Sequence, residues 1–272
     1  MPVVRMAIAL AAVVSVSPVS SGRAQGALQP GPYEAQLEAL LKAHDTMAVG
    51  RAIFPANATA ETTARAAAWL KTQQTSKGGG TLIAVLYGAL LWRSAQQAAE
   101  PDKTRLSREA GVQYFLARLL IVTEGFQCKD KTASPAGESS IEGQIGVVRQ
   151  YLQRLPEAER TQLMADAFNV MLATFAVREN DFWLCSLGTT QFGKYLDKHP
   201  EVGQKPVGEL EGKTVPGTVG KTITLGNDPS ILPDFVPYSD WQARRRARID
   251  TTVSVLGVKP PADYGDAKHR MK

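Results

Sequence analysis

The sequence predicts a mainly α-helical protein, a single bundle of about six to eight helices with an irregular Gly/Pro-rich arm and a C-terminal helix. Between Pro32 and Lys198, apolar residues recur at spacings of three and four, the period of one helix face. Residues 81–92 are apolar all round, which is typical of a helix in the middle of a core. Residues 200–237 hold six prolines and six glycines, too many for a continuous helix.

Residues 1–24 are expected to form a signal peptide. Arg5 precedes an apolar run that ends near Val16, and Gly22 and Ala24 satisfy the small-x-small rule of signal peptidase. The run is shorter than the roughly 20 residues that span a bilayer. We therefore predict cleavage near Ala24 and a periplasmic or secreted mature protein.

Residues 25–199 are expected to form the helical body. Proline and glycine positions divide it, because Pro55, Pro101 and Pro156 mark helix ends or starts and residues 78–80 are three consecutive glycines. Thr59 is the expected N-cap of the second helix. In the third helix, the leucines at 82, 86 and 90 are expected to be almost fully buried. The expected helices cover about residues 32–48, 59–77, 81–99, 103–126, 140–155, 156–175 and 182–196.

Residues 200–237 are expected to be an arm that packs on the body, since Phe235 and its neighbours are too apolar for a free linker. Residues 213–215 and 221–225 flank a Pro-Gly pair and are compatible with a small β-hairpin. A basic C-terminal helix is expected over 238–257, opened by a capping box at Ser239, and residues 258–272 are expected to be a loose tail.

Composition excludes several classes of protein. The 272 residues are 44% hydrophobic and 21% charged, ordinary values for a globular chain. The net charge of +5 falls to +3 once Arg5 and Arg23 are removed with the signal peptide, too small a balance to predict nucleic-acid binding. Two cysteines and three histidines offer little material for a metal centre, so we expect no metal and no cofactor.

Cys128 and Cys185 are expected to form a structural disulfide. An exported chain with an even cysteine count usually pairs its cysteines. In an antiparallel arrangement the helices that precede them end on the same side of the bundle. A redox pair is the alternative, although such sites favour the closer C-x-x-C spacing.

The glycines at 78–80 lie between Lys77 and a helix start. Their bare backbone amides offer an anion site at the positive end of a helix. No G-K-[ST] sequence follows them, so they do not form a P-loop. The simpler interpretation, which we prefer, is a tight connector in which side chains would clash.

Four carboxylates near expected helix ends raise the alternative of a glycosidase: Glu124, Asp166, Glu179 and Asp181. Glycoside hydrolysis needs two carboxylates that face one cleft. The sequence does not show that these meet, Asp181 is a candidate helix cap, and we assign no catalytic residue. His44 is expected on the apolar face of the first helix, while His199 and His269 are expected in loops.

Trp241, Arg244, Arg246 and Arg248 form the candidate surface for an anionic partner, which is either an envelope protein or an anionic surface. A solvated helix face is the simpler interpretation. Arg245 lies in line with Trp241 and Ile249 at helical spacing, so its stem is expected on the core and its guanidinium at the rim.

These observations predict an exported bacterial cell-envelope protein with a non-enzymatic binding or accessory role. The alternative is an envelope hydrolase of the glycan-cleaving type, with a carboxylate pair in an interhelical groove. The 34-residue tetratricopeptide pattern does not fit residues 81–126, and the sequence contains no internal repeat.

Overall fold

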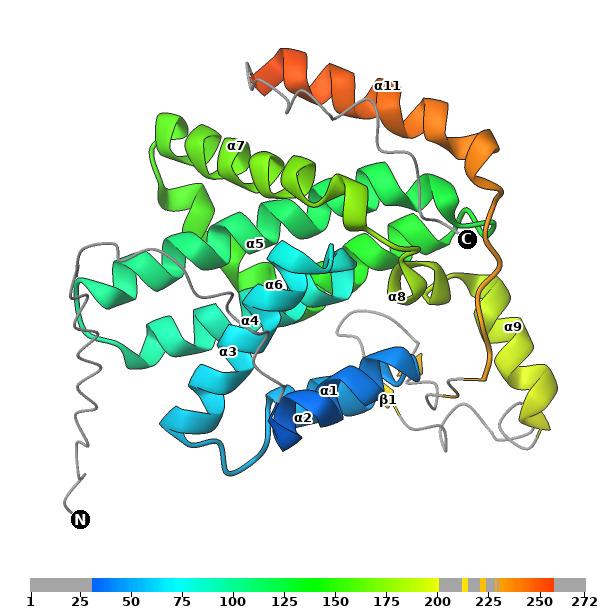
Figure 1. The fold of residues 1–272 in the computed structure, drawn as a ribbon, viewed down its shortest axis with the longest axis horizontal. Helices are drawn as coiled ribbons and strands as arrows, with labels where there is room; N and C mark the ends of the chain where they lie inside the picture. Colours follow the sequence, from blue (N-terminus) through cyan, green and yellow to red (C-terminus); the bar gives the residue numbers. More distant parts are fainter. Residues whose placement is uncertain (1–30, 201–211, 215–220, 224–227, 229, 257–272) are drawn as a thin grey trace, which may run out of the picture.

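The computed structural model describes residues 31–200, 212–214, 221–223, 228 and 230–256. The fold is mainly α-helical, as the sequence predicts (Figure 1). The helices of the described segments are α1 (Pro32–Lys42), α2 (Thr46–Ile53), α3 (Ala60–Ser76), α4 (Gly80–Gln97), α5 (Asp102–Glu124), α6 (Ala133–Arg154), α7 (Glu157–Ala173), α8 (Phe182–Ser186), α9 (Thr189–Lys198) and α11 (Tyr238–Leu256). Two short 3-10 helices are η1 (Gly125–Gln127) and η2 (Phe175–Val177).

Helix α4 is the centre of the core. It packs along α5 and α3 and also contacts α2, α6 and α8, so it is enclosed on most sides. Leu82, Leu86 and Leu90 are 7%, 5% and 3% exposed, which confirms the prediction from the apolar run. Helix α3 begins as expected, because the Thr59 hydroxyl accepts a hydrogen bond from the Thr62 amide in a capping box.

Two expected helices are each divided by a turn. The first ends at Lys42 and α2 starts at Thr46, so the prediction that His44 lies on a helix face is wrong. His44 instead has a φ of 56° in the connecting turn. The last helix of the body is divided at Leu187 and Gly188 into α8 and α9.

Helix α6 begins at Ala133, seven residues before the expected start, so the preceding loop is short. We expected a longer loop because the serines and the glycine in this segment are poor helix formers. The segment is helical nevertheless, because Ala133 and Gly137 are buried against the core. Tertiary packing outweighs propensity in this segment.

The described end of the arm lies on the body. Backbone hydrogen bonds join the Lys129 amide to the Asp234 carbonyl and the Val236 amide to the Gln127 carbonyl, at 3.0 and 2.8 Å. The Phe235 ring meets Phe182 edge-on at 5.0 Å between centroids. Strands β1 (Gly212–Thr214) and β2 (Lys221–Ile223) pair antiparallel as the expected hairpin. The signal peptide, the tail and His269 lie outside the described residues.

Helix α11 crosses one side of the bundle (Figure 1) and contacts α5 and η1. It begins at Tyr238, so Ser239 lies in its first turn and its hydroxyl donates to the Asp240 carboxylate, instead of opening the helix as a cap. Trp241 and Ile249 are 2% and 0% exposed, so they form the buried stripe that the spacing predicts.

Candidate functional site

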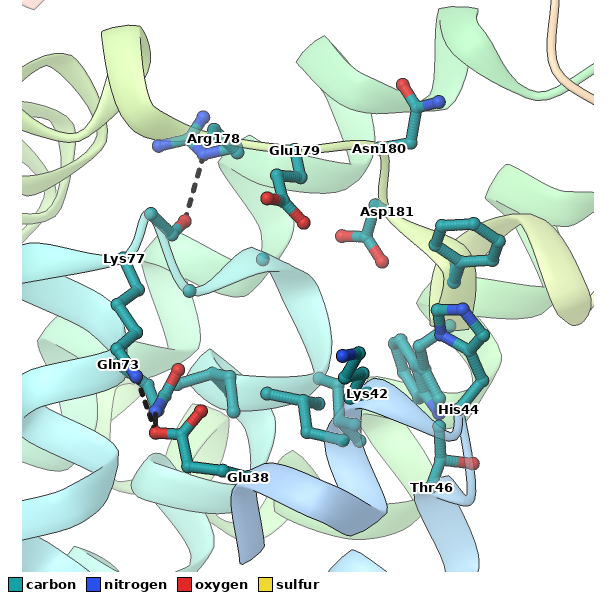
Figure 2. A pocket seen from close by; sticks show the side chains of 18 residues that line it. Glu38, Lys42, His44, Thr46, Gln73, Lys77, Arg178, Glu179, Asn180 and Asp181 are labelled. Atoms are coloured by element: carbon teal, nitrogen blue, oxygen red, sulfur yellow. Dashed lines mark hydrogen bonds and ion pairs between the residues drawn. The ribbon is translucent and has the colours of Figure 1, made fainter. Parts of the chain in front are cut away.

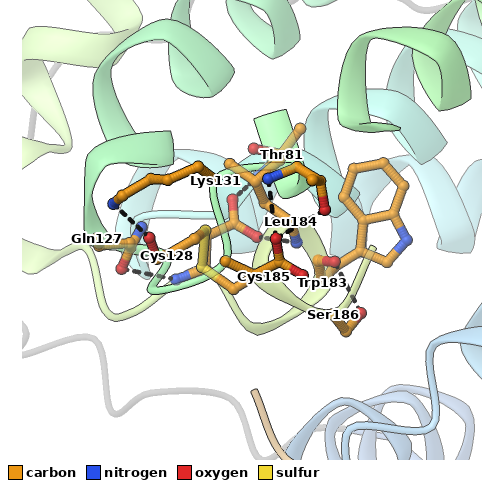
Figure 3. The surroundings of a disulfide bond; sticks show 11 residues. Thr81, Gln127, Cys128, Lys131, Trp183, Leu184, Cys185 and Ser186 are labelled. Atoms are coloured by element: carbon orange, nitrogen blue, oxygen red, sulfur yellow. Dashed lines mark hydrogen bonds between the residues drawn. A yellow bond between two sulfur atoms is a disulfide. The ribbon is translucent and has the colours of Figure 1, made fainter. Parts of the chain in front are cut away.

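The predicted disulfide joins Cys128, just after η1, to Cys185 in α8 (Figure 3). The sulfurs are 1.95 Å apart and the two Cα atoms 5.1 Å apart. Both cysteines are buried, at 0% and 1% exposure, which suits a structural bond and not an accessible redox pair. The bond holds α8 against the end of α5 and so fixes the segment that precedes α8.

That segment places Asp181 at the N-terminus of α4. One carboxylate oxygen accepts the Thr81 amide at 2.7 Å, and the other accepts the Leu184 amide at 3.0 Å and so caps α8. The predicted cap is therefore confirmed. Burial raises the pKa of this carboxyl, and the hydrogen bonds oppose that rise. The anion at the positive end of α4 is thus a side chain of the protein itself.

The triple glycine is a tight connector, as preferred from the sequence. Gly78, Gly79 and Gly80 all have positive φ, at 81°, 57° and 77°. A Cβ on Gly78 would lie 2.7 Å from the Arg178 Cα, so no side chain fits there. The backbone of Arg178 can therefore lie directly against the turn before α4.

Behind this turn lies a buried ion cluster, defined here as Glu124, Arg178 and Arg245. One Glu124 oxygen accepts hydrogen bonds from both guanidiniums, at 2.8 Å from Arg178 and 2.5 Å from Arg245. The three residues are 0%, 5% and 1% exposed. Burial lowers the pKa of Arg178 and the Glu124 carboxylate opposes that change. Glu124 is therefore enclosed as a counter-ion and is not a groove residue.

Arg245 corrects a prediction. Its guanidinium was expected at the rim of α11, yet it lies inside, 3.8 Å from the centroid of the Phe175 ring and 5.3 Å from that of Trp241. The reason is Glu124, a counter-ion 121 residues away in the sequence. With Trp241 buried, the exposed residues of the predicted anion-binding surface are Arg244, Arg246 and Arg248.

An open groove of about 500 Å³ lies in front of the turn, and we call it the charged groove (Figure 2). Glu179 and Asp181 extend into it from one wall, and Glu38 and Lys42 of α1 lie on the opposite wall. The closing residues of α3 form its remaining side. The groove is thus assembled from three segments that are far apart in the sequence.

Glu38 is held firmly in this groove. One of its oxygens accepts hydrogen bonds from the Trp69 indole at 3.1 Å, from the Lys77 ammonium at 2.6 Å and from the Gln73 amide. Lys42 and Glu179 differ from it, because both are exposed and neither forms an ion pair within the described ranges. Lys42 and Glu179 are therefore the groove's cation and anion that are not engaged in an ion pair within the described ranges.

His44 stands at the end of the charged groove. Its ring stacks on Phe182 with centroids 3.9 Å apart and an interplanar angle of 21°. Burial lowers the pKa of His44, and the nearby Glu179 carboxylate opposes this. The lowered pKa favours the neutral imidazole, which offers a flat face and a hydrogen-bonding nitrogen.

A second groove, also about 500 Å³, begins on the other side of this ring pair. We call it the apolar groove, because Met47, Phe192 and Leu232 contribute partly exposed apolar side chains to its wall. His44, Thr46, Phe182 and Trp183 line both grooves, so the two hollows adjoin.

The structure brings only two of the four candidate acids to one groove. Glu179 and Asp181 line it, but they lie two residues apart on the same wall. Glu124 is enclosed by arginines, and Asp166 accepts a hydrogen bond from Gln162 on α7. His199 contacts the Asp228 carboxylate at 3.1 Å, away from the charged groove.

Sequence reasoning missed Glu38, Lys42, Lys77 and Arg178 as groove or cluster residues. Glu38 and Lys77 lie 39 residues apart, and Arg178 meets Gly78 across 100 residues. No local pattern reports contacts of that length. Two local signals marked this region, the glycine triplet, where backbones approach closely, and Asp181, which was a candidate helix cap.

Within the described segments, no group of three or more His, Cys, Asp or Glu side chains is arranged to hold a metal ion. In those same segments, no helix combines the length and apolarity that a bilayer span requires. Comparisons with protein-family models, curated proteins and solved structures found no match.

Proposed function

We propose that this chain is an exported protein of the bacterial cell envelope that binds a small ligand or a partner without chemical conversion. The observation that carries the proposal is the charged groove. It presents Lys42 and Glu179 with no ion pair in the described part of the chain, whereas Glu124 and Asp181 serve the fold. Exposed opposite charges beside an aromatic pair suit recognition by hydrogen bonds and stacking.

The buried disulfide supports the export half of the proposal, because such bonds persist in oxidising compartments. A fusion of residues 1–30 to a reporter enzyme that is active only outside the cytoplasm tests it. We expect full reporter activity, and loss of that activity when the apolar run is interrupted by arginine. A reporter that stays inactive contradicts export.

A glycan hydrolase remains the second candidate, because Glu38 and Glu179 face one groove from opposite walls. Hydrolysis uses two such carboxylates, one as acid and one as base or nucleophile. Incubation of purified peptidoglycan with the mature protein, followed by mass spectrometry of soluble products, separates the two functions. Binding without new products supports the first. Products that disappear with Glu38→Gln and Glu179→Gln support the hydrolase.

We also propose that Arg244, Arg246 and Arg248, which are exposed around α11, contact an anionic envelope surface. Arg244, Arg246 and Arg248 are exposed in the middle part of α11, and an anionic surface attracts exposed cations. The test is binding to vesicles that contain phosphatidylglycerol. We expect binding at low salt that weakens at high salt and with Arg244→Glu plus Arg248→Glu. Equal binding by parent and variant contradicts this contact.

A further inference from the structure

The charged groove and the apolar groove share one wall. His44, Thr46, Phe182 and Trp183 line both, and each groove has a volume of about 500 Å³. The stacked rings of His44 and Phe182 therefore stand at the junction of two adjoining hollows. A ligand longer than one groove can extend past the rings and occupy both.

Both grooves have polar and apolar side chains in their walls, and they expose different ones to a ligand. On the charged side, Lys42 and Glu179 are exposed and have no ion pair in the described segments. On the apolar side, Met47, Phe192 and Leu232 are 47%, 36% and 48% exposed, and all three line the same groove. The joined cleft thus combines exposed apolar side chains with Lys42 and Glu179, whereas its charged residues Glu38, Lys77 and Asp228 are already in ion pairs.

The backbone at the junction is unusual as well. The His44 and Asp45 amides donate to the Leu41 and Leu40 carbonyls, at 3.0 Å each, which closes α1 in a Schellman motif. The left-handed residue of this motif is most often glycine, yet here it is histidine with a φ of 56°. His44 thus occupies a position where glycine would be less strained, and its side chain lines both grooves.

Building on the proposed binding function, we propose that the joined cleft binds a short peptide with apolar side chains, a free ammonium and a free carboxylate. Lys42 matches the carboxylate and Glu179 matches the ammonium. The rings of His44 and Phe182 and the apolar groove take the side chains. A simple anion would meet the Glu38 and Glu179 carboxylates, and a hydrocarbon would leave both free charges unused.

The probes are leucyl-leucine and three derivatives, titrated calorimetrically into the mature, oxidised protein. N-acetylation removes the ammonium, C-terminal amidation removes the carboxylate, and glycyl-glycine removes the apolar side chains. We expect saturable binding of leucyl-leucine. Each blocked form should bind about tenfold or more weakly because it loses a charged hydrogen bond, and glycyl-glycine should bind about tenfold or more weakly because it buries no apolar side chain.

Variants assign the two ends of the peptide. Glu179→Gln is expected to weaken leucyl-leucine binding about tenfold and to leave the affinity for the N-acetyl form unchanged. Lys42→Met is likewise expected to weaken leucyl-leucine binding about tenfold and to leave the affinity for the amidated form unchanged. Glu61→Gln and Lys103→Met, exposed and distant from both grooves, are the matched controls and should bind like the parent.

His44→Gly tests the junction with little risk of misfolding, because glycine suits a φ of 56°. We expect a stable variant with at least threefold weaker leucyl-leucine binding. No saturable binding of leucyl-leucine at millimolar concentration overturns the inference, and so does binding that is indifferent to blocked ends. If another envelope compound binds instead, the proposed function stands and only the peptide inference fails. If export fails or glycan products appear while the peptide binds, the proposed function fails and the peptide inference stands.

Discussion

The carboxylates around the turn before α4 divide into two kinds, although the sequence presents them alike. Glu124 and Asp181 are enclosed, and every contact they make is with the protein's own arginines or backbone amides. Glu179, between them in the sequence and one residue after Arg178, is exposed and has no ion pair in the described segments. The comparison shows that proximity to a groove does not make an acid available to a ligand. Its exposure to solvent does, since the second Glu124 oxygen accepts no hydrogen bond within the described residues and yet is fully buried.

The largest expected loss of stability is at an enclosed carboxylate, Glu124. Glu124→Gln leaves two buried guanidiniums without a counter-ion and should lower the free energy of unfolding by about 3–5 kcal/mol. Urea denaturation measures it, with the exposed Glu138→Gln as control. Joint replacement by Glu124→Leu, Arg178→Met and Arg245→Met should cost less than the single change. A Glu124→Gln protein as stable as the parent would contradict the enclosed role.

The disulfide that fixes the Asp181 segment is expected to come next. It closes a loop of 57 residues, and the chain-entropy model gives about 4 kcal/mol for that length. Cys128→Ser and Cys185→Ser should each lower the melting temperature, and the double variant should add nothing further. Thiol titration of the unfolded periplasmic protein should find no free thiol. Two titratable thiols would show that the bond does not form in the envelope.

A smaller loss is expected at the turn itself. Gly78→Ala places a Cβ against the Arg178 backbone at a φ of 81°, which should cost about 2–3 kcal/mol. Gly143→Ala is the matched control, because a Cβ there meets nothing within 4 Å on α6. That change should stabilise the protein by about 0.5–1 kcal/mol. Equal effects at the two sites would mean that the backbones are not in close contact.

Asp130 is expected to make a pH-dependent contribution of about 1 kcal/mol to the free energy of unfolding. Partial burial raises the pKa of Asp130, but hydrogen bonds from Thr132 and Thr190 outweigh it and lower the pKa to about 2. The folded pKa lies below the unfolded value of about 3.9. The contribution is therefore complete above pH 4 and is lost as the pH falls toward 2.

The expected change in the free energy of unfolding is small because the Asp130 carboxyl is partly solvated and its interactions are screened. Asp130→Asn should lower the free energy of unfolding at pH 7 and flatten its dependence between pH 4 and 2. Asp166→Asn, on the outer part of α7, serves as control. Parallel pH curves for the parent and Asp130→Asn would contradict the shift.

The sequence predicted the features that depend on local pattern or on count. The apolar run placed α4 in the core, the even number of cysteines in a chain predicted to be exported indicated the disulfide, and Asp181 was recognised as a cap. For Arg245 the prediction was right for the stem, which lies on the core, and wrong for the guanidinium, which is buried. Helical spacing orients the stem but says nothing about the distant counter-ion Glu124. His44 was misplaced because periodicity continues through a left-handed turn unnoticed.

The charged groove was beyond sequence reasoning for a different reason. Its walls come from α1, the end of α3 and the segment before α8, and no periodicity relates these three. Glu38 looks like a solvated residue of α1 until Trp69, Gln73 and Lys77 surround it. Sites built by long-range packing carry no signature in a single sequence, whereas elements built by local periodicity do.

The central claim, that the enclosed acids hold the fold and the exposed acid serves a ligand, is tested most directly on Glu179→Gln. Its free energy of unfolding and its leucyl-leucine affinity are measured on the same preparation, beside the parent and Glu61→Gln. The account predicts a free energy of unfolding within about 0.5 kcal/mol of the parent, as for other surface changes, and binding weakened about tenfold. A marked loss of stability with unchanged binding would contradict it.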